Sequence, residues 1–300
     1  MEDFIALGKK IYNTENPREM HRLIVFVIRC LLNRGKMKEL AQYFNHTALL
    51  QRVAAVYPFV YEQPTRAFFY NQSTFRESID LLEQHMNFLQ EKLSDETIQA
   101  IYCGEQLELW DGGEFEDKPL KLVLYFEPGY RKEGLLSVRL NLGQSPLYII
   151  MFWIAKDKNG EWSMWIGAMQ GPNMENSRDI IKRVTKYCHA YRTKNLIAYS
   201  AQAVARNLGL KHIFAVTNQG YYANNHVRRD RKLKTSFSDF WEEAGGKPSG
   251  DERFFVLPMT EYRKDIEEIP TRKRANYRKR FALLDEIDAA IAEGIGKLRK

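Results

Sequence analysis

The stretch Trp162-Ser163-Met164-Trp165-Ile166-Gly167-Ala168-Met169-Gln170-Gly171-Pro172-Asn173 combines a half-buried strand pattern with a turn, and a helical pattern follows at once. A strand that leads straight into a helix points free backbone N–H groups beyond its end, and a helix N-terminus favours anions. The loop has neither the lysine of a P-loop nor the three glycines of a dinucleotide fingerprint. We expect an anion pocket made by Gln170, Gly171, Asn173, Asn176 and Ser177, with Arg178 as a counter-charge.

Four segments of alternating apolar and polar residues predict strands up to this turn. They are rich in β-branched and aromatic residues, as strands usually are. Short turns separate them, among them Glu127-Pro128-Gly129 and Asp157-Lys158-Asn159-Gly160, so consecutive antiparallel hairpins are the simplest connection. The predicted strands are 121–126, 135–142, 147–155 and 162–169.

Helical and strand patterns alternate after the turn. Two helices are expected, and Gly209 closes the second as a left-handed cap. A polar segment, 217–236, separates the last elements. The expected elements are helices at 175–191 and 195–208, a strand at 213–216, a helical turn at 237–241 and a strand at 254–257.

The first third of the chain has helical periodicity. Thr74 and Glu77 form a capping-box pattern, and apolar residues recur behind it at spacings of three and four. His85 has no second metal ligand one turn away, so we expect it at the surface or boundary of this helix. From 103 to 119 the sequence is acidic and glycine-rich, and Asp111-Gly112-Gly113 is the expected turn. This change predicts a domain boundary.

These patterns predict an α+β fold with two domains: a helical one at 1–103, and at 104–300 a mixed, mainly antiparallel sheet with helices and a basic C-terminal helix. A chain of 300 residues with 44% apolar content can bury a large core. The longest early apolar run, 23–28, is cut by Arg29 and is too short to cross a bilayer. Without a signal-peptide pattern, we expect a cytoplasmic protein.

The three cysteines, Cys30, Cys103 and Cys188, are too widely spaced for a disulfide framework or a Cys-x-x-Cys metal site. Each is expected to be a buried thiol, and no metal is expected. Cys188-His189 is no nucleophile pair, because neighbours on a helix point about 100° apart.

The net charge of +7 is concentrated in two clusters, 228–234 and 272–280. A basic surface attracts phosphates, acidic proteins or anionic lipid, although a solvated helix face explains the same charges. Helical spacing places Arg274 and Arg278 one turn apart and facing outward, with Tyr277 and Phe281 packing on the domain. We expect this helix to dock on an acidic partner or anionic membrane. No zinc finger, helix-turn-helix or aromatic RNA-binding signature accompanies the charge, so nucleic acid is not expected.

The polar segment after 216 holds the candidate proton-transfer groups. His226 could take a proton from an attacking amine or hydroxyl, and Tyr222 could return one to a leaving thiolate; the alternative is that His226 is an ordinary solvated residue. Trp241 is either a core residue or the wall of a ligand cleft. Asn225, Arg228, Arg229 and Trp241 complete the expected substrate or partner contacts.

Four stretches in order resemble the VirK/YbjX family of Gram-negative bacteria over nearly the whole chain. They are Trp165-Ile166-Gly167-Ala168-Met169-Gln170-Gly171-Pro172, the step from Leu208-Gly209-Leu210 to Ala215-Val216, Phe240-Trp241-Glu242-Glu243 with Gly245-Gly246, and 273–280. The family is associated with virulence and with envelope stress or antimicrobial-peptide tolerance. The resemblance implies a cytoplasmic role or one facing the inner membrane, and it supplies no catalytic residues.

The predicted layout also resembles that of the GNAT acyltransferases, in which the pyrophosphate of the acyl donor lies at the helix N-terminus after the fourth strand. Two features differ: GNAT loops carry a second glycine and a preceding arginine, and a strand follows their helix. The expectation is transfer of an acyl group from acyl-CoA or acyl carrier protein to an amine or hydroxyl. The alternative is a protein that binds anionic lipid or an acidic partner without chemistry.

Overall fold

The structure is a computed structural model that describes residues 3–224 and 236–300. Its N-terminal part is helical, and side chains of Asp3, Asn16, Thr47, Thr74 and Ser94 accept hydrogen bonds from first-turn N–H groups. The capping box of Thr74 and Glu77 is confirmed. The helices are α1 (Phe4–Ile11), α2 (Pro17–Leu32), α3 (Arg34–Phe44), α4 (Ala48–Val56), α5 (Phe75–Lys92) and α6 (Asp95–Tyr102), with short 3₁₀ turns at Pro58–Tyr61 and Gln63–Thr65.

A single mixed sheet follows, with the strand order β1-β2-β3-β4-β5-β6-β8-β7. Neighbouring strands are antiparallel except β5 and β6, which are parallel. The fold is therefore α+β with a mainly antiparallel sheet, as predicted. The strands are β1 (Leu107–Phe115), β2 (Lys118–Tyr125), β3 (Leu136–Leu142), β4 (Ser145–Lys156), β5 (Trp162–Gln170), β6 (His212–Val216), β7 (Lys247–Pro248) and β8 (Phe254–Leu257).

The first strand was missed by the sequence patterns, and the turn expected at Asp111-Gly112-Gly113 is wrong. β1 runs through these residues, and a register shift between Asp111 and Glu114 absorbs the glycines as a bulge. The chain reverses instead at Glu116 and Asp117, whose φ angles of 52° and 58° suit a tight hairpin. The change from helices to strands falls between Tyr102 and Leu107; the predicted two-domain division stays a prediction.

Four further helices complete the fold. Gly209 follows α8 with φ of 77°, as expected for a left-handed cap. The helix expected at 175–191 is shorter because Asn176, His189 and Ala190, all with positive φ, bound it. The helices are α7 (Ser177–Tyr187), α8 (Thr193–Asn207), α9 (Phe237–Glu243) and α10 (Thr271–Leu298), with 3₁₀ turns at Pro128–Tyr130 and Ile266–Glu268.

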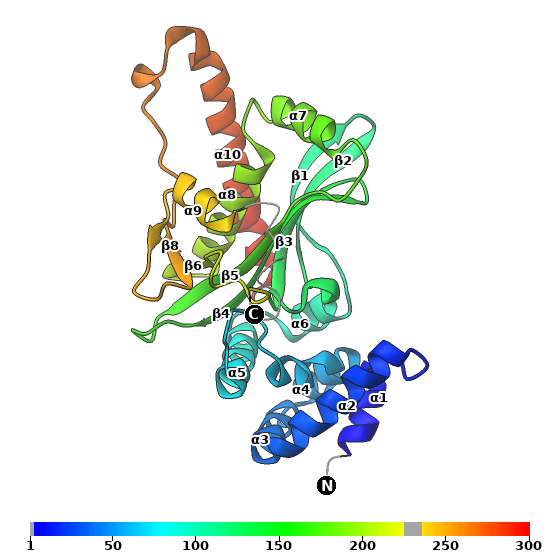
Figure 1. Ribbon diagram of the computed structural model, residues 1–300. Coiled ribbons are helices and arrows are strands. Elements are labelled where there is room, and N and C mark those ends of the chain that lie inside the picture. The colour runs from blue at the N-terminus through cyan, green and yellow to red at the C-terminus, as the bar shows by residue number, and fades with distance from the viewer. Residues whose placement is uncertain (1–2, 225–235) are drawn as a thin grey trace.

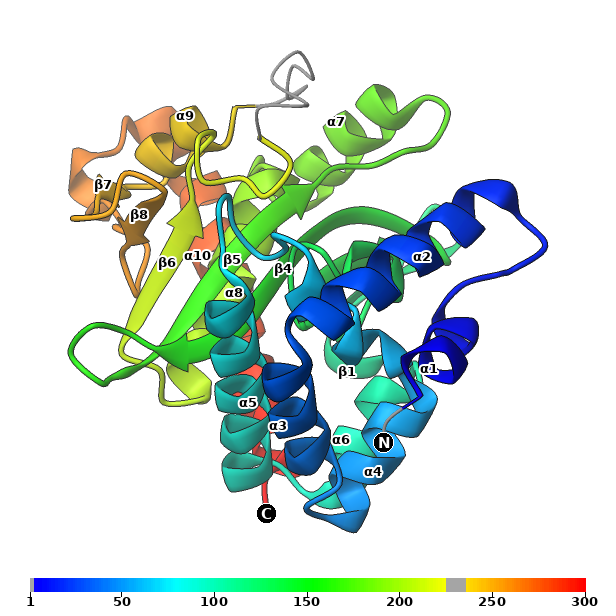
Figure 2. The same ribbon diagram turned by 60° about the horizontal axis from the view of Figure 1, so that its bottom comes forward.

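The helices cover both sides of the sheet. Helix α10 packs on α8 and β1, and α5 packs on β4; Figure 2 shows α5 in front of the sheet and α10 behind it. In Figure 1 the N-terminal helices gather at one end of the molecule and α7 lies at the other. One large apolar core extends from Leu40 to Ile295, and a smaller one joins α1, α2 and α3.

His85 is fully buried, so its expected surface position is wrong. The reason is the length of β4: β3 ends its pairing at Phe152, and the later N–H groups of β4 need other partners. His85 Nδ1 accepts from Ile154 N at 3.1 Å, and Gln84 Oε1 accepts from Lys156 N at 2.7 Å. Cys103 is exposed, which corrects the expectation that every thiol is buried; Cys30 and Cys188 are buried as predicted.

Candidate functional site

Strands β5 and β6 separate at a defined residue. They pair only from Ser163 to Ile166 along β5, although β5 continues to Gln170. In the ladder with β4, Ile166 is opposite Phe152 and Ala168 is opposite Met151, so Gly167 between them has no opposite residue. Such a bulge bends a strand. Figure 2 shows the carboxyl ends of β5 and β6 apart.

The bulge supports the segment that carries Glu133. A Cβ atom on Gly167 would lie 1.9 Å from the carbonyl oxygen of Glu133, and one on Gly134 would lie 2.6 Å from Phe152 N. Only glycine allows two backbones to approach this closely. The main chain at 133–134 therefore lies directly on β4 and β5 at the point where β5 leaves β6.

The side chain of Glu133 reaches toward the turn that follows β6. Glu133 is 5% exposed, and its Oε1 accepts a hydrogen bond from the Tyr221 hydroxyl at 3.2 Å. Its Oε2 is buried and makes no hydrogen bond of ordinary geometry with a described residue. Burial raises the pKa of Glu133 to about 7, against the opposing effects of the Tyr221 hydroxyl, the Lys132 charge and the Tyr222 hydroxyl.

A carboxyl group with this pKa exchanges protons near neutral pH, which suits it to act as a general base or acid. The adjacent Tyr221 has its pKa raised, first by burial and then by the charge of Glu133. The rings of Tyr221 and Tyr222 are 4.9 Å apart, and Tyr222 packs edge-on against Phe68 at 6.0 Å. Glu133, Tyr221 and Tyr222 together are called the carboxyl–tyrosine cluster below.

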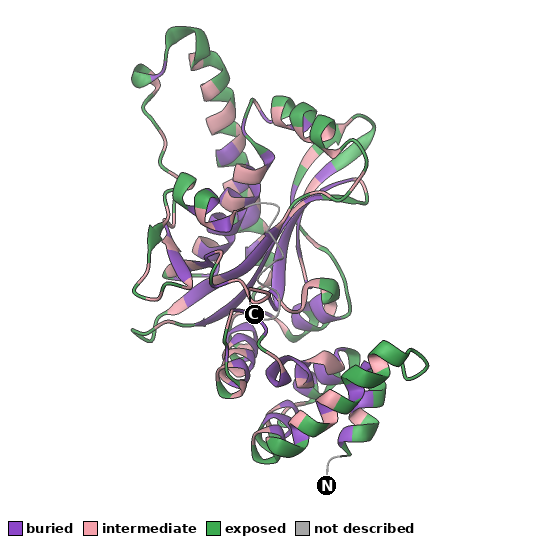
Figure 3. Cartoon of the chain, in the orientation of Figure 1, coloured by how far each residue is buried: buried purple, intermediate pink, exposed green. Residues whose placement is uncertain are grey.

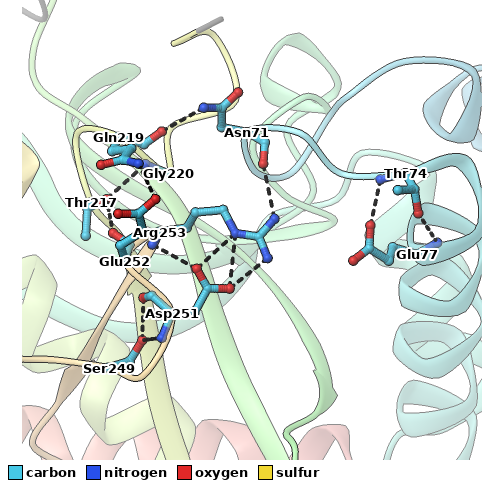
Figure 4. A network of polar contacts seen from close by, with 10 residues as sticks. All are labelled: Asn71, Thr74, Glu77, Thr217, Gln219, Gly220, Ser249, Asp251, Glu252 and Arg253. Carbon is cyan, nitrogen blue, oxygen red and sulfur yellow. Dashed lines mark hydrogen bonds and ion pairs between the residues drawn. The ribbon is translucent and has the colours of Figure 1, made fainter.

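Three loops hold this cluster in place. The turn at Thr217–Gly220 closes on the Thr217 hydroxyl, which accepts from Gly220 N at 2.9 Å and donates to Glu252 O. Asn71 donates through its side chain to Gln219 O and through its backbone to Gly220 O. Figure 4 shows these contacts converging.

Arg253 joins the same loops from the opposite side. It forms several hydrogen bonds with Asp251 and donates to Asn71 O at 3.4 Å. The pKa of Asp251 lies below its usual value, mainly because of the bonds from Arg253. Phe69 adopts φ of 71° and donates from its N–H to Lys132 O at 2.6 Å. A left-handed aromatic residue is strained, and such strain is concentrated at functional sites.

The expected anion pocket lies along the loop from β5 to α7. Helix α7 begins at Ser177, seven residues beyond Gln170, so the helix does not start at once as predicted. Asn176, the residue before α7, has φ of 54°, and its side chain does not accept a hydrogen bond from the first N–H groups of the helix. Gly171, Asn173, Asn176 and Arg178 are exposed, and Gln170 and Ser177 are half-buried.

Charges near this helix end are mixed. Asp179 lies in the first turn of α7, and Glu175 is exposed just before it. Both carboxylates oppose a bound anion, whereas Arg178 favours one. A Cβ on Gly171 would touch the ring of Tyr148 at 3.4 Å, so this glycine lies against an aromatic side chain.

The other predicted residues have different outcomes. Tyr222 lies in the carboxyl–tyrosine cluster. Trp241 is fully buried and donates from Nε1 to Val216 O at 3.0 Å, so it is a core residue that holds the end of β6. Asn225, His226, Arg228 and Arg229 lie outside the described residues.

The expected outward pair on α10 is only half correct. Arg278 is exposed, but Arg274 is half-buried and donates to Ile269 O and Glu267 O, each at 2.9 Å. These bonds hold the 3₁₀ turn that precedes α10. Tyr277 and Phe281 contact one another, and Arg280 lies 4.2 Å from the Tyr277 ring centroid.

Sequence patterns gave no indication of Glu133 and Tyr221 as a pair, because they are 88 residues apart.

A surface hollow of about 770 Å³ lies between α1 and α4, lined in part by Ala6, Leu7, Val56 and Pro58. None of the cluster residues lines it. We place the candidate site at the cluster, where buried polar groups and strand ends coincide.

The family model described as "Protein of unknown function (DUF535)" matches residues 15–293. "Uncharacterized protein YbjX" of Escherichia coli K12 is 30% identical over 261 residues, which cover 85% of this chain and 77% of that protein. An uncharacterized protein of Haemophilus influenzae is 25% identical over 90% of this chain and 87% of its own length. "Membrane protein LapB" of Mannheimia haemolytica is 23% identical over 70% of this chain and 85% of its own.

No solved structure matches the chain. Across residues 3–224 and 236–300, none of the helices combines the length and the apolar character needed to span a bilayer. The predicted resemblance to the VirK/YbjX family is confirmed by the family match and the Escherichia coli relative.

Proposed function

The chain belongs to the DUF535 family, and we propose that it transfers an acyl group from a thioester, either acyl-CoA or an acylated carrier protein, to an amine or hydroxyl. One observation carries the proposal: Glu133 lies where β5 and β6 separate, and the pKa of its carboxyl group is raised to about 7. Its main chain lies against Gly167 of β5, and its side chain accepts from Tyr221 in the turn after β6. A base placed at separated strand ends can meet a substrate that enters between them.

The free edge of β5 supports a donor with an extended arm. Within residues 3–224 and 236–300, the strand has no ladder partner on its β6 side from Gly167 to Gln170. An extended chain that contains amides can pair with such an edge, and the pantetheine arm of both donors is of this kind. The loop with Gln170, Gly171, Asn173, Asn176, Ser177 and Arg178 continues from this edge and would meet the donor's phosphates. The layout resembles that of GNAT acyltransferases.

The proton transfers would involve the cluster. Ionised Glu133 removes a proton from the acceptor as its nitrogen or oxygen attacks the thioester carbonyl carbon. The carbon–sulfur bond then breaks, and the Tyr222 hydroxyl protonates the departing thiolate. The proton held by Glu133 restores Tyr222, so the cluster ends as it began. In this scheme Glu133 is the base; His226 stays a prediction that the same assay tests.

The test compares Glu133→Gln with the parent in an assay of thiol release from acyl-CoA or acylated carrier protein. A Cys103→Ser background removes the exposed thiol that would react with the reagent. We expect the substitution to lower turnover by roughly a hundredfold or more while thioester binding persists. Glu127→Gln, on the same segment and ion-paired with Arg139 at 3.4 Å, is the matched control.

Three results would overturn the proposal. If no thioester raises the melting temperature, no donor binds. If thioesters bind but no thiol is released with any amine or hydroxyl offered, the chain is a binding protein of the kind expected as the alternative. If Glu133→Gln turns over at the parental rate, Glu133 is not the base, and His226→Gln becomes the decisive variant.

The place of action is a further part of this proposal. The name of the Mannheimia relative describes a membrane protein, and the family resemblance implies a cytoplasmic role or one facing the inner membrane. We therefore propose an acceptor in the envelope and a location at the cytoplasmic side of the inner membrane.

A further inference from the structure

Helix α2 exposes an apolar stripe. The described residues expose nine large apolar side chains, and five of them belong to this helix. Scattered exposed apolar residues are ordinary, whereas a contiguous group marks an interaction surface. The five, with their exposed fractions, are Met20 (37%), Ile24 (51%), Ile28 (50%), Leu31 (58%) and Leu32 (79%).

Their spacing places them on one face. Met20, Ile24 and Ile28 follow one another at four residues, and Leu31 and Leu32 continue the row by three and four. The opposite face of α2 buries Leu23, Phe26 and Cys30 in the small core with α1 and α3. The helix is thus already anchored without the stripe. Figure 3 shows α2 with exposed residues along its length and no element lying over them in that view.

Arginines border the stripe. Arg18 and Arg22 are exposed one turn apart, about 40° and about 80° beyond Leu32 on the helical projection, and Arg34 is exposed just beyond the helix end. Glu19, which lies 3.9 Å from Arg22, is on the buried side of the projection. A helix that lies in a membrane interface needs an apolar face together with long cationic side chains that reach the headgroups. On α2 the arginines follow the apolar face along one border, the one that Leu32 forms.

The size of the stripe favours lipid over a second copy of the chain. A helix of 16 residues is about 24 Å long. Five half-exposed side chains offer a few hundred Å², below the roughly 800 Å² per partner of a stable protein interface. A fluid lipid surface has no such minimum, and its phosphates attract the neighbouring arginines.

We propose that α2 docks the protein on an anionic membrane, with Ile24, Ile28 and Leu32 among the acyl chains and Arg18 and Arg22 on lipid phosphates. This surface is separate from the basic part of α10 predicted from the sequence. It also does not depend on acyl transfer, because none of its residues belongs to the carboxyl–tyrosine cluster.

The first test is flotation of the full chain with vesicles of phosphatidylglycerol and phosphatidylethanolamine in equal parts, and with phosphatidylcholine vesicles. We expect binding to the anionic vesicles that weakens between low and physiological salt. The double variant Ile28→Ser and Leu32→Ser should lower binding by roughly tenfold or more, since two apolar side chains no longer enter the bilayer. Tyr262→Ser, which removes an apolar residue with the same exposed fraction as Leu32 (79%), should bind as the parent does.

A fluorophore gives a second readout that needs no loss of binding. In a Cys103→Ser background the remaining thiols are buried, so Leu32→Cys can be labelled alone with an environment-sensitive dye. Anionic vesicles should shift its emission to the blue, while the same dye at Tyr262→Cys should not respond. Replacing Arg18 and Arg22 by Gln should remove the salt dependence of the Leu32 signal.

Four outcomes would overturn the docking proposal. The first is that the parent binds no anionic vesicle, and the second is that the double serine variant floats as well as the parent. The third is that Arg278→Glu abolishes binding while the α2 variants do not, which would assign docking to α10. The fourth is that light scattering finds a dimer in the parent and a monomer in the double variant, which would make the stripe a protein interface. Glu133→Gln should bind vesicles normally, so failure of the acyl-transfer proposal is scored separately.

Discussion

Two buried glutamates lie close to the same segment, and their surroundings differ completely. Glu62 is held by the Tyr12 hydroxyl at 2.7 Å, by Arg131 Nε at 3.0 Å and by Arg66 Nε at 3.4 Å. Among the described residues, the carboxylate of Glu133, two residues beyond Arg131, accepts one hydrogen bond of ordinary geometry, from Tyr221. The first carboxylate is paired with two arginines, whereas burial raises the pKa of the second to about 7.

The difference separates a structural carboxylate from a reactive one. Arg131 stacks on Phe59 at 4.0 Å and accepts at its carbonyl from Gln63, so the ion pair fixes the start of the segment to the N-terminal helices. The glycines at 134 and 167 fix its end to the sheet. Glu133 is therefore positioned by the backbone on both sides, and its carboxyl group need not contribute to stability.

The largest expected effect comes from Glu62→Gln. Removing the charge leaves Arg131 and Arg66 beside a neutral amide. Breaking a fully buried ion pair costs about 3 to 5 kcal/mol. Because both arginines are partly exposed, we expect a loss at the lower end of this range, about 3 kcal/mol. At pH 8 Glu133→Gln should lower the free energy of unfolding by less than about 1 kcal/mol or should raise it, because the amide replaces a buried charge. Urea unfolding of both variants measures this contrast, and equal losses would contradict it.

The next prediction concerns pH. The folded pKa of Glu133 is about 7, above the ordinary value of 4.5. Between these values the folded chain binds more protons at this site than the unfolded chain, so its contribution to stability falls as pH rises from 4.5 to 7 and is constant above. The fall is on the order of 3 kcal/mol.

A matched pair isolates this group from the others. The free energy of unfolding of Glu133→Gln minus that of the parent should increase from pH 4.5 to pH 7 and then level off. A flat difference across this range would mean that Glu133 titrates normally and is not a base near neutral pH.

The sequence predicted well what local patterns determine. Alternating residues and turn residues located β2 to β5, and the capping residues located the start of α5. Glu133 escaped because its burial depends on Gly167 and Tyr221, far along the chain. Trp241 could not be assigned before the fold showed that its indole bonds to the end of β6. The contacts that make a site are long-range, and a single sequence does not encode them as a pattern.

At pH 8 a substitution of His85 should cost less stability than Glu62→Gln, and the pH dependence that His85 causes has the opposite sign to that of Glu133. His85 is fully buried, and burial lowers its pKa to about 3, so the ring stays neutral and accepts from Ile154 N. A base with a lowered folded pKa contributes stability above the unfolded value of 6.5 and loses it as pH falls toward 3. Burial favours the uncharged form of both Glu133 and His85. Lowering the pH therefore raises the contribution of Glu133 to stability and lowers that of His85.

His85→Leu separates the two. The variant leaves Ile154 N without its acceptor and should lower the free energy of unfolding by about 1 to 2 kcal/mol at pH 8. As pH falls below 6.5 the parent loses the His85 contribution and the variant does not, so the gap should narrow and then reverse. Urea unfolding from pH 8 to pH 4 measures it. A gap that stays constant over this range would show that His85 is protonated as easily in the folded chain as in the unfolded one, and that burial alone does not set the charge of these groups.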